Sequence, residues 1–163
     1  MPDTAVISAT SVIHASFVIE RRYPASAERV FAAFADPAKK RRWFADERHI
    51  PVESFEMDFR VGGHDRAVYR MSDSTPFPGA AMTNDTVYQD IVPGRRIVFA
   101  YTMSIAERRI SASLVTVELS PDGAGARMLF TEQAAFFDGS DGPKMRQEGW
   151  EGLLANLETA LAG

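Results

Sequence analysis

Glu132 and Arg146 are the two residues whose types and positions most strongly suggest chemistry in this sequence. Glu132 shares one face of a strand-like alternation with Met128 and Phe130, and Arg146 falls among the apolar positions of a helical segment. Because an unpaired buried charge is costly, we expect the two side chains to form a partly buried ion pair. The pair would either orient the polar group of a mostly apolar ligand or be purely structural, and Arg146 could instead reach solvent from the first turn of its helix.

Glu132 is a poor candidate for a general base, because a neighbouring guanidinium is expected to lower the pKa of its carboxyl group. We therefore assign no catalytic residue. The histidines His14, His49 and His64 lack the close spacing of a metal site, and we expect neither a metal nor a cofactor. The sequence contains no cysteine, phosphate-binding loop, dinucleotide motif or nucleophile elbow. Whether the protein catalyses a reaction stays open at this point.

The helical segment that carries Arg146, residues 143–161, is amphipathic and long enough to lie across a sheet. Asp141 is a candidate N-cap, and Pro143 suits the first turn of a helix. We expect Trp150, together with the leucines on the same face, to contact at least two strands of that sheet.

Gly149 lies inside the apolar face of this helix, where it costs about 1 kcal/mol relative to alanine. A solid core would favour a larger residue there, so the missing side chain predicts a hollow beneath the helix. Its expected volume is about the 300–1,000 Å³ usual for small-molecule sites. We expect the hollow to open near residues 26–44 or near a polar loop at 72–83.

The rest of the chain divides by hydrophobic period into one strand, two short helices and six further strands. The expected strands are 12–23, 52–61, 64–71, 86–92, 96–104, 110–119 and 127–136, and the expected short helices are 27–35 and 37–44. Ser26 and Asp36 should cap the two helices, and the basic run at 39–42 should face solvent. Gly62 and Gly63 predict a tight hairpin turn, and residues 1–10 are expected to form a loose arm.

The composition excludes several classes of function. The chain has 163 residues and a net charge of −4, which argues against nucleic acid as a main partner. No apolar run approaches the roughly 18 residues of a membrane span, and the N-terminus lacks the pattern of a signal peptide. These features predict a single domain over residues 1–163 that acts in the cytoplasm.

Six short motifs occur in a telling order. They are Arg22-Tyr23-Pro24-Ala25 with Glu28-Arg29-Val30-Phe31; Phe34-Ala35-Asp36-Pro37 with Trp43-Phe44; Asp58-Phe59-Arg60-Val61-Gly62-Gly63; Tyr88 with Asp90-Ile91-Val92-Pro93; Phe130-Thr131-Glu132-Gln133; and Arg146 with Glu148-Gly149-Trp150 and Leu153-Leu154. Together they resemble the START-like (SRPBCC) superfamily, and within it bacterial proteins similar to the C-terminal domain of activators of the heat-shock chaperone ATPase. Two departures are Asp90, where many relatives carry Glu, and the long loop at 72–83.

The resemblance implies an α+β, helix-grip fold. A curved antiparallel sheet would wrap around the long C-terminal helix, two short helices would follow the first strand, and a cavity would lie between sheet and helix. The candidate ligand-binding residues are Trp43, Phe59, Tyr69, Phe99, Tyr101, Phe130, Glu132, Arg146, Gly149, Trp150 and Leu153.

Three hypotheses of function follow, because this superfamily hosts many activities on one fold. The leading one is a binding protein for an apolar or amphipathic small molecule. The second is an enzyme of the cyclase, dehydratase or hydrolase type that uses the same pocket. The third is a module that regulates a chaperone, which we favour less because the chaperone activators carry an additional N-terminal domain for which this chain has no residues. The oligomeric state is left open, with a homodimer among the options.

Overall fold

The computed structural model describes residues 12–46, 51–75 and 77–163. Within these residues, seven strands form one antiparallel sheet in the order β1-β7-β6-β5-β4-β3-β2, and three helices accompany it. The elements are β1 (Ile13–Tyr23), α2 (Ala27–Ala35), α3 (Pro37–Phe44), β2 (Val52–Met57), β3 (His64–Arg70), β4 (Ala81–Val92), β5 (Arg96–Ile105), β6 (Arg108–Asp122), β7 (Gly125–Phe136) and α4 (Gly142–Ala162). The predicted arm at residues 1–10 and His49 lie outside the described residues.

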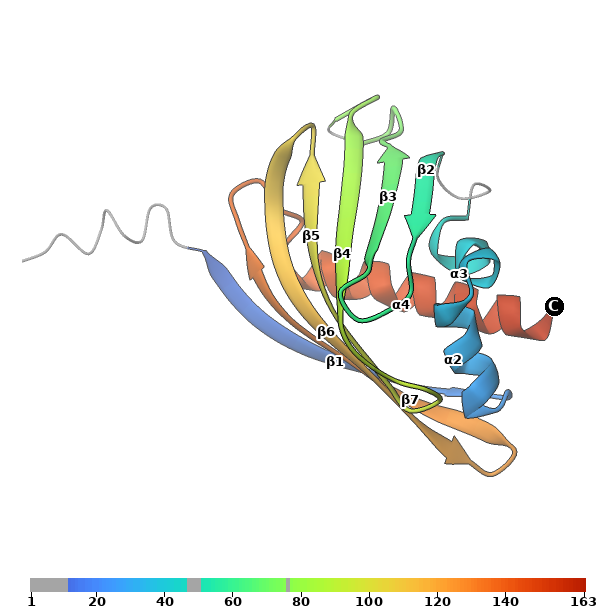
Figure 1. Cartoon of the computed structure of the whole chain (residues 1–163). Helices are drawn as coiled ribbons and strands as arrows, with labels where there is room; N and C mark the ends of the chain where they lie inside the picture. Colours follow the sequence, from blue (N-terminus) through green and yellow to red (C-terminus); the bar gives the residue numbers. More distant parts are fainter. Residues whose placement is uncertain (1–11, 47–50, 76) are drawn as a thin grey trace, which may run out of the picture.

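The sheet bends around α4, and α2 and α3 lie beside the C-terminal half of that helix (Figure 1). The hydroxyl of Tyr23 on β1 donates to the carbonyl of Leu154, 3.1 Å away, and Nη2 of Arg29 on α2 donates to the carbonyl of Leu161 at 2.7 Å. This is the helix-grip arrangement expected from the motifs. None of the helices in the described part of the chain is long and apolar enough to cross a bilayer.

The two short helices begin at the caps predicted from the sequence. The Oγ of Ser26 accepts a hydrogen bond from the backbone N–H of Arg29 at 3.2 Å. Oδ1 of Asp36 accepts from the N–H groups of Ala38 and Lys39, and Pro37 occupies the first turn of α3. Each cap satisfies N–H groups that a helix start leaves without an intrahelical partner.

Asp141 does not act as the predicted cap of α4. Its side chain makes no capping hydrogen bond, and its own backbone is already helical. The carboxylate instead binds the guanidinium of Arg146, one turn further along the helix. A charge-assisted bidentate contact is stronger than a hydrogen bond to a backbone N–H, so the arginine takes the carboxylate.

The inward faces of β5 and β7 follow the predicted period of two. Ile97, Phe99 and Tyr101 are buried on β5, and Met128, Phe130 and Glu132 are fully buried on β7. Trp150 reaches both strands from α4, with its ring centroid 4.6 Å from that of Phe130 and 6.4 Å from that of Phe99. The predicted contact of Trp150 with two strands is therefore confirmed.

The connection between β2 and β3 is longer than the expected two-residue turn. β2 ends at Met57, and residues 58–63 make a loop in which a Cβ on Gly63 would lie 2.1 Å from the carbonyl oxygen of Asp58. Asp58 and Arg60 form an exposed pair, 2.8 Å between Oδ2 and Nε, so they point away from the core. Phe55 and Phe59 of the same segment pack against the core.

β4 begins at Ala81, five residues before the predicted start at 86. The residues before the predicted start include Asn84 and Asp85, two residue types with a low preference for strands. They form a strand because β3 pairs with this segment on one side and β5 on the other. Tertiary pairing therefore overrides a weak local preference.

Candidate functional site

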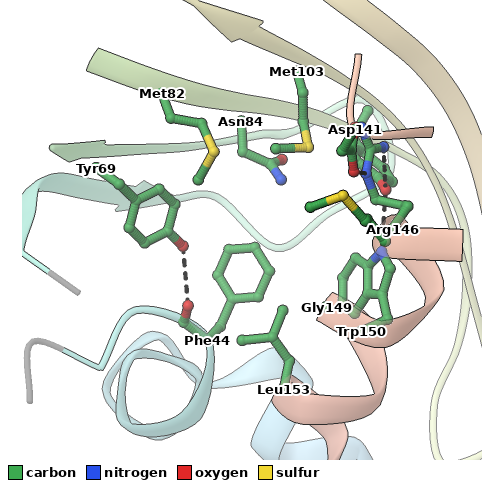
Figure 2. A pocket seen from close by; sticks show the side chains of 12 residues that line it. Phe44, Tyr69, Met82, Asn84, Met103, Asp141, Arg146, Gly149, Trp150 and Leu153 are labelled. Atoms are coloured by element: carbon green, nitrogen blue, oxygen red, sulfur yellow. Dashed lines mark hydrogen bonds and ion pairs between the residues drawn. The ribbon is translucent and has the colours of Figure 1, made fainter. Parts of the chain in front are cut away.

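A pocket of about 230 Å³ lies between the first half of α4, the strands β3 to β5 and the end of α3 (Figure 2). It is lined by Phe44, Tyr69, Met82, Asn84, Tyr101, Met103, Asp141, Met145, Arg146, Gly149, Trp150 and Leu153. The volume is below the range expected from the sequence and corresponds to roughly eight water molecules at about 30 Å³ each in the liquid. The site therefore suits a small molecule, or one part of a larger one.

Most of the pocket wall is apolar and comes from three parts of the fold. Phe44 closes α3, Met82 and Met103 come from β4 and β5, and Leu153 comes from α4. The wall also includes Tyr69, whose hydroxyl donates to the carbonyl of Phe44 at 2.9 Å (Figure 2). Methionine side chains adapt readily to different apolar shapes, so this wall can accommodate a ligand without a rigid template.

Arg146 forms the polar end of the pocket and is held by several partners. Its Nε lies 2.8 Å from Oδ2 of Asp141, and its Nη2 lies 2.9 Å from Oδ1. Nη2 also donates to Oγ of Ser111 at 2.8 Å, and Nη1 donates to the hydroxyl of Tyr101 at 3.0 Å. Nη1 is 3.6 Å from Oε2 of Glu132, so the predicted Arg146–Glu132 ion pair is present. It is longer than the ion pair between Arg146 and Asp141, at 2.8 Å. Burial opposes the charged form, but the hydrogen bonds that Arg146 donates to Asp141 keep the pKa of Arg146 above its ordinary value.

Tyr101 connects the arginine to the buried glutamate. Its hydroxyl donates to the carboxylate of Glu132, 2.8 and 2.9 Å from the two oxygens. The same oxygen accepts from Nη1 of Arg146 and from Nε1 of Trp150, both at 3.0 Å. A hydroxyl has one hydrogen and two lone pairs, so this group has no free capacity. Burial, followed by the nearby carboxylate of Glu132, raises the pKa of the Tyr101 phenol.

The pKa of Glu132 is raised overall, so the expected net lowering is wrong, although the guanidinium of Arg146 does act in the lowering direction. Burial is the largest cause and outweighs the hydrogen bonds from Tyr101 and Ser113 and the charge of Arg146. The guanidinium is directed mainly at Asp141, which is closer to it than Glu132 is. Glu132 is fully buried behind Tyr101 and does not line the pocket.

Six of the sequence-predicted ligand residues line the pocket. They are Tyr69, Tyr101, Arg146, Gly149, Trp150 and Leu153. The other five, Trp43, Phe59, Phe99, Phe130 and Glu132, lie elsewhere in the core or at its edge.

Each aromatic residue outside the pocket has a packing role. Trp43 is fully buried, and its Nε1 donates to the carbonyl of Ala33 at 2.9 Å. Phe59 packs edge-on against Tyr88, with ring centroids 4.8 Å apart. Phe99 and Phe130 pack against Trp150 and so support the pocket wall from behind.

Gly149 lies at the rim of the pocket and not in the buried stripe of α4 as predicted. The buried residues of the helix are Arg146, Trp150, Leu154 and Leu157, so the buried face is rotated from the predicted one. Gly149 is exposed, and a Cβ built on it meets nothing within 4 Å. The glycine keeps the mouth of the pocket open and does not create a sealed hollow.

Six lining residues were absent from the predicted set. They are Phe44, Met82, Asn84, Met103, Asp141 and Met145. Met103 follows the inward face of Phe99 and Tyr101, so its orientation was available from the sequence. The period-two series Met82, Asn84, Thr86 and Tyr88 could have shown that β4 begins early, but the polar residues around it indicated a loop.

A second buried cluster lies beside the pocket and corrects another expectation. The basic run at 39–42 was expected to face solvent, yet Lys40 is buried, with its Nζ 2.9 Å from Oδ2 of Asp65 and 3.2 Å from the hydroxyl of Tyr88. The Tyr88 hydroxyl donates to the same Oδ2. Oδ1 of Asp65 has no hydrogen-bond partner among the described residues. Burial lowers the pKa of Lys40, and Asp65 acts in the opposite direction.

Residues 24–162 match the family model described as Activator of Hsp90 ATPase homolog 1-like protein. A solved structure from Rhizobium loti is 51% identical, with a TM-score of 0.80 over 92% of this chain and 99% of that one. Another from Rhizobium leguminosarum is 41% identical, with a TM-score of 0.86 over 93% and 97% of the two chains. A Chromobacterium violaceum protein is 25% identical, with a TM-score of 0.69 over 91% and 97%. No curated protein matches the chain. The matched region includes every residue that lines the pocket.

Proposed function

The chain belongs to the family of Activator of Hsp90 ATPase homolog 1-like proteins, and on this premise we propose that it binds a small, largely apolar molecule in the pocket beneath α4. The observation that carries the proposal is the pocket itself, with a mostly apolar lining that is open at Gly149. Concave sites of this composition are the usual places for small ligands in proteins.

The polar network at the end of the pocket supports binding over catalysis. Tyr101 already uses its hydrogen and both lone pairs, and Glu132 lies behind it without contact with the pocket. A general acid or base must reach the reacting group directly or through one water. The network is thus better suited to fixing the pocket wall than to transferring a proton to a ligand.

Toluene is a suitable first probe because it is compact, apolar and uncharged. Protein carrying ¹³C-methyl methionine would be titrated with toluene and followed by NMR. The methyl signals of Met82 and Met103, which line the pocket, should shift and saturate. The methyl signal of Met128, which is fully buried in β7 away from the pocket lining, should stay in place.

Replacement of Gly149 by leucine tests whether binding occurs at this mouth. The new side chain would start in open space and extend over the pocket, so the variant should fold and lose toluene binding. Gly152→Leu is the matched control, because Gly152 lies in the same helix, also meets nothing within 4 Å and does not line the pocket. Absence of saturable shifts in the wild type would overturn the proposal and favour the chaperone-module hypothesis. Equal binding by both variants would overturn the location of the binding site at the mouth beside Gly149.

A further inference from the structure

Asn84 is an unusual residue for its position in the sheet. It lies within β4, paired with Ala67 of β3 and Met103 of β5, on the face that lines the pocket. Figure 2 shows its side-chain amide between the side chains of Met82 and Met103. Asparagine has a low strand preference, and placing an amide among apolar side chains is unfavourable unless its hydrogen bonds are satisfied.

The amide of Asn84 is mostly unsatisfied by the protein. Its Oδ1 accepts one hydrogen bond from the hydroxyl of Thr86, at the long distance of 3.3 Å. Among the described residues, its Nδ2 has no hydrogen-bond partner. A side-chain amide has two N–H donors and two acceptor lone pairs, so Asn84 can offer both donors and one acceptor site to a molecule in the pocket.

The other polar groups of the lining are already engaged. Arg146 donates four hydrogen bonds, to Asp141, Ser111 and Tyr101, and its Nη1 also forms the 3.6 Å ion pair with Glu132. The hydroxyl of Tyr101 is saturated, and that of Tyr69 donates its hydrogen to the carbonyl of Phe44. Among the lining side chains of the described residues, Asn84 is therefore the neutral one whose N–H donors are unused.

The charges around the pocket disfavour an ionic ligand. One guanidinium, that of Arg146, faces two carboxylates, so the polar end has no surplus positive charge for an anion. A ligand carboxylate would also lie near Asp141, which lines the pocket, and like charges repel. The oxygens of Asp141 already accept from Arg146 and Ser140, which leaves little for a ligand cation.

We propose that Asn84 determines the ligand class, and that the pocket selects neutral molecules whose polar group both donates and accepts hydrogen bonds, as a primary amide does. This inference rests on the proposed binding function and specifies its ligand. Such a group can pair with the donor and the acceptor of the asparagine side chain at once. The apolar part of the ligand then lies against Phe44, Met82 and Met103.

Benzamide, benzoate, benzylamine and toluene form a matched set of ligands for the test. Binding is followed by the methyl signals of Met82 and Met103. Benzamide should bind the wild type at least about tenfold more tightly than the isosteric anion benzoate, and also more tightly than benzylamine. Asn84→Leu, which keeps the size of the side chain, should weaken benzamide by about tenfold and leave toluene binding unchanged or improved. If the new leucine side chain blocks the pocket, Asn84→Ala, which only removes atoms, allows the same comparison of benzamide binding with toluene binding.

The outcomes separate the two proposals. If the wild type binds toluene, the binding function is sustained. If each of the variants Asn84→Leu and Asn84→Ala then changes the affinity for toluene and for benzamide by the same factor, the role of Asn84 is overturned. Tighter binding of benzoate or benzylamine than of benzamide would overturn the selection of neutral ligands. Failure of all four ligands to bind would refute both proposals.

Discussion

Arg146 should be far more important for stability than an ordinary arginine of this protein. Its side chain is 5% exposed, and that of Glu132 is 0% exposed. Removing one partner of a buried pair typically costs about 3–5 kcal/mol, because the other charge is left without compensation. We therefore expect Arg146→Met to lower the free energy of unfolding by about 3–5 kcal/mol.

A second substitution should recover part of this loss. In Glu132→Gln with Arg146→Met, the fully buried carboxylate is replaced by a neutral group that still accepts from Tyr101. Asp141 keeps its charge, but its side chain is 25% exposed and water can reach it. The double variant should therefore be more stable than Arg146→Met alone, with a coupling between the two sites of about 0.5–3 kcal/mol.

Urea unfolding followed by far-UV circular dichroism measures these differences without relying on Trp150, which belongs to the same network. Arg70→Met is the control, because Nη2 of Arg70 is 2.7 Å from Oε1 of Glu53 while both side chains are about half exposed, at 48% and 46%. That exposed pair should be worth at most about 1 kcal/mol. If Arg146→Met costs no more than Arg70→Met, or if the two losses in the double variant simply add, the buried network does not contribute as described.

Two further predictions concern buried charges. The pKa of Glu132 is raised in the folded state, so its contribution to stability is present below its ordinary value of 4.5 and is lost as the pH rises through the folded-state pKa. Glu132→Gln should remove this pH dependence, which urea titrations at acidic and neutral pH would measure. If the wild type loses no stability relative to the variant between these two pH values, the raised pKa of Glu132 is contradicted. Lys40→Met should cost about 3–5 kcal/mol because it strands the buried Asp65, whereas the exposed neighbour Lys39→Met should change stability by no more than about 0.5 kcal/mol. Equal thermal melting shifts for the two lysine variants would exclude a buried role for Lys40.

The parts of the fold that the sequence predicted correctly depend on local signals. Ser26 and Asp36 satisfy helix N–H groups two or three residues away, so their capping roles can be inferred from adjacent residues alone. The alternation on β5 and β7 reflects a strand with one buried face, which repeats every two residues. The early start of β4 was missed because Asn84 and its neighbours are strand residues only through pairing with β3 and β5.

The site was harder to predict because its key partners are distant in the sequence or were assigned another role. Lys40 is buried because Asp65, 25 residues away, supplies a carboxylate at 2.9 Å, and nothing in the basic run itself distinguishes Lys40 from Lys39. Asp141 has the residue type and position of a helix cap, and no local signal in the sequence indicates that its carboxylate binds Arg146 instead. A candidate pair such as Arg146 and Glu132 can be recognised from periodicity, but the order of preference among several partners requires the distances.

Those distances change the interpretation of Arg146. As a ligand-binding residue it would need a free N–H group in the pocket, yet its donors are directed at Asp141 just before α4, at Tyr101 on β5 and at Ser111 on β6. The arginine thus ties the first turns of α4 to the sheet, and Tyr101 extends the same connection to Trp150. Since Tyr101 and Trp150 both line the pocket, the effect of Arg146 on a ligand would be exerted through the shape of the wall. The buried charge is then a means of holding an apolar surface in place, and the recognition of polar groups passes to the uncharged Asn84.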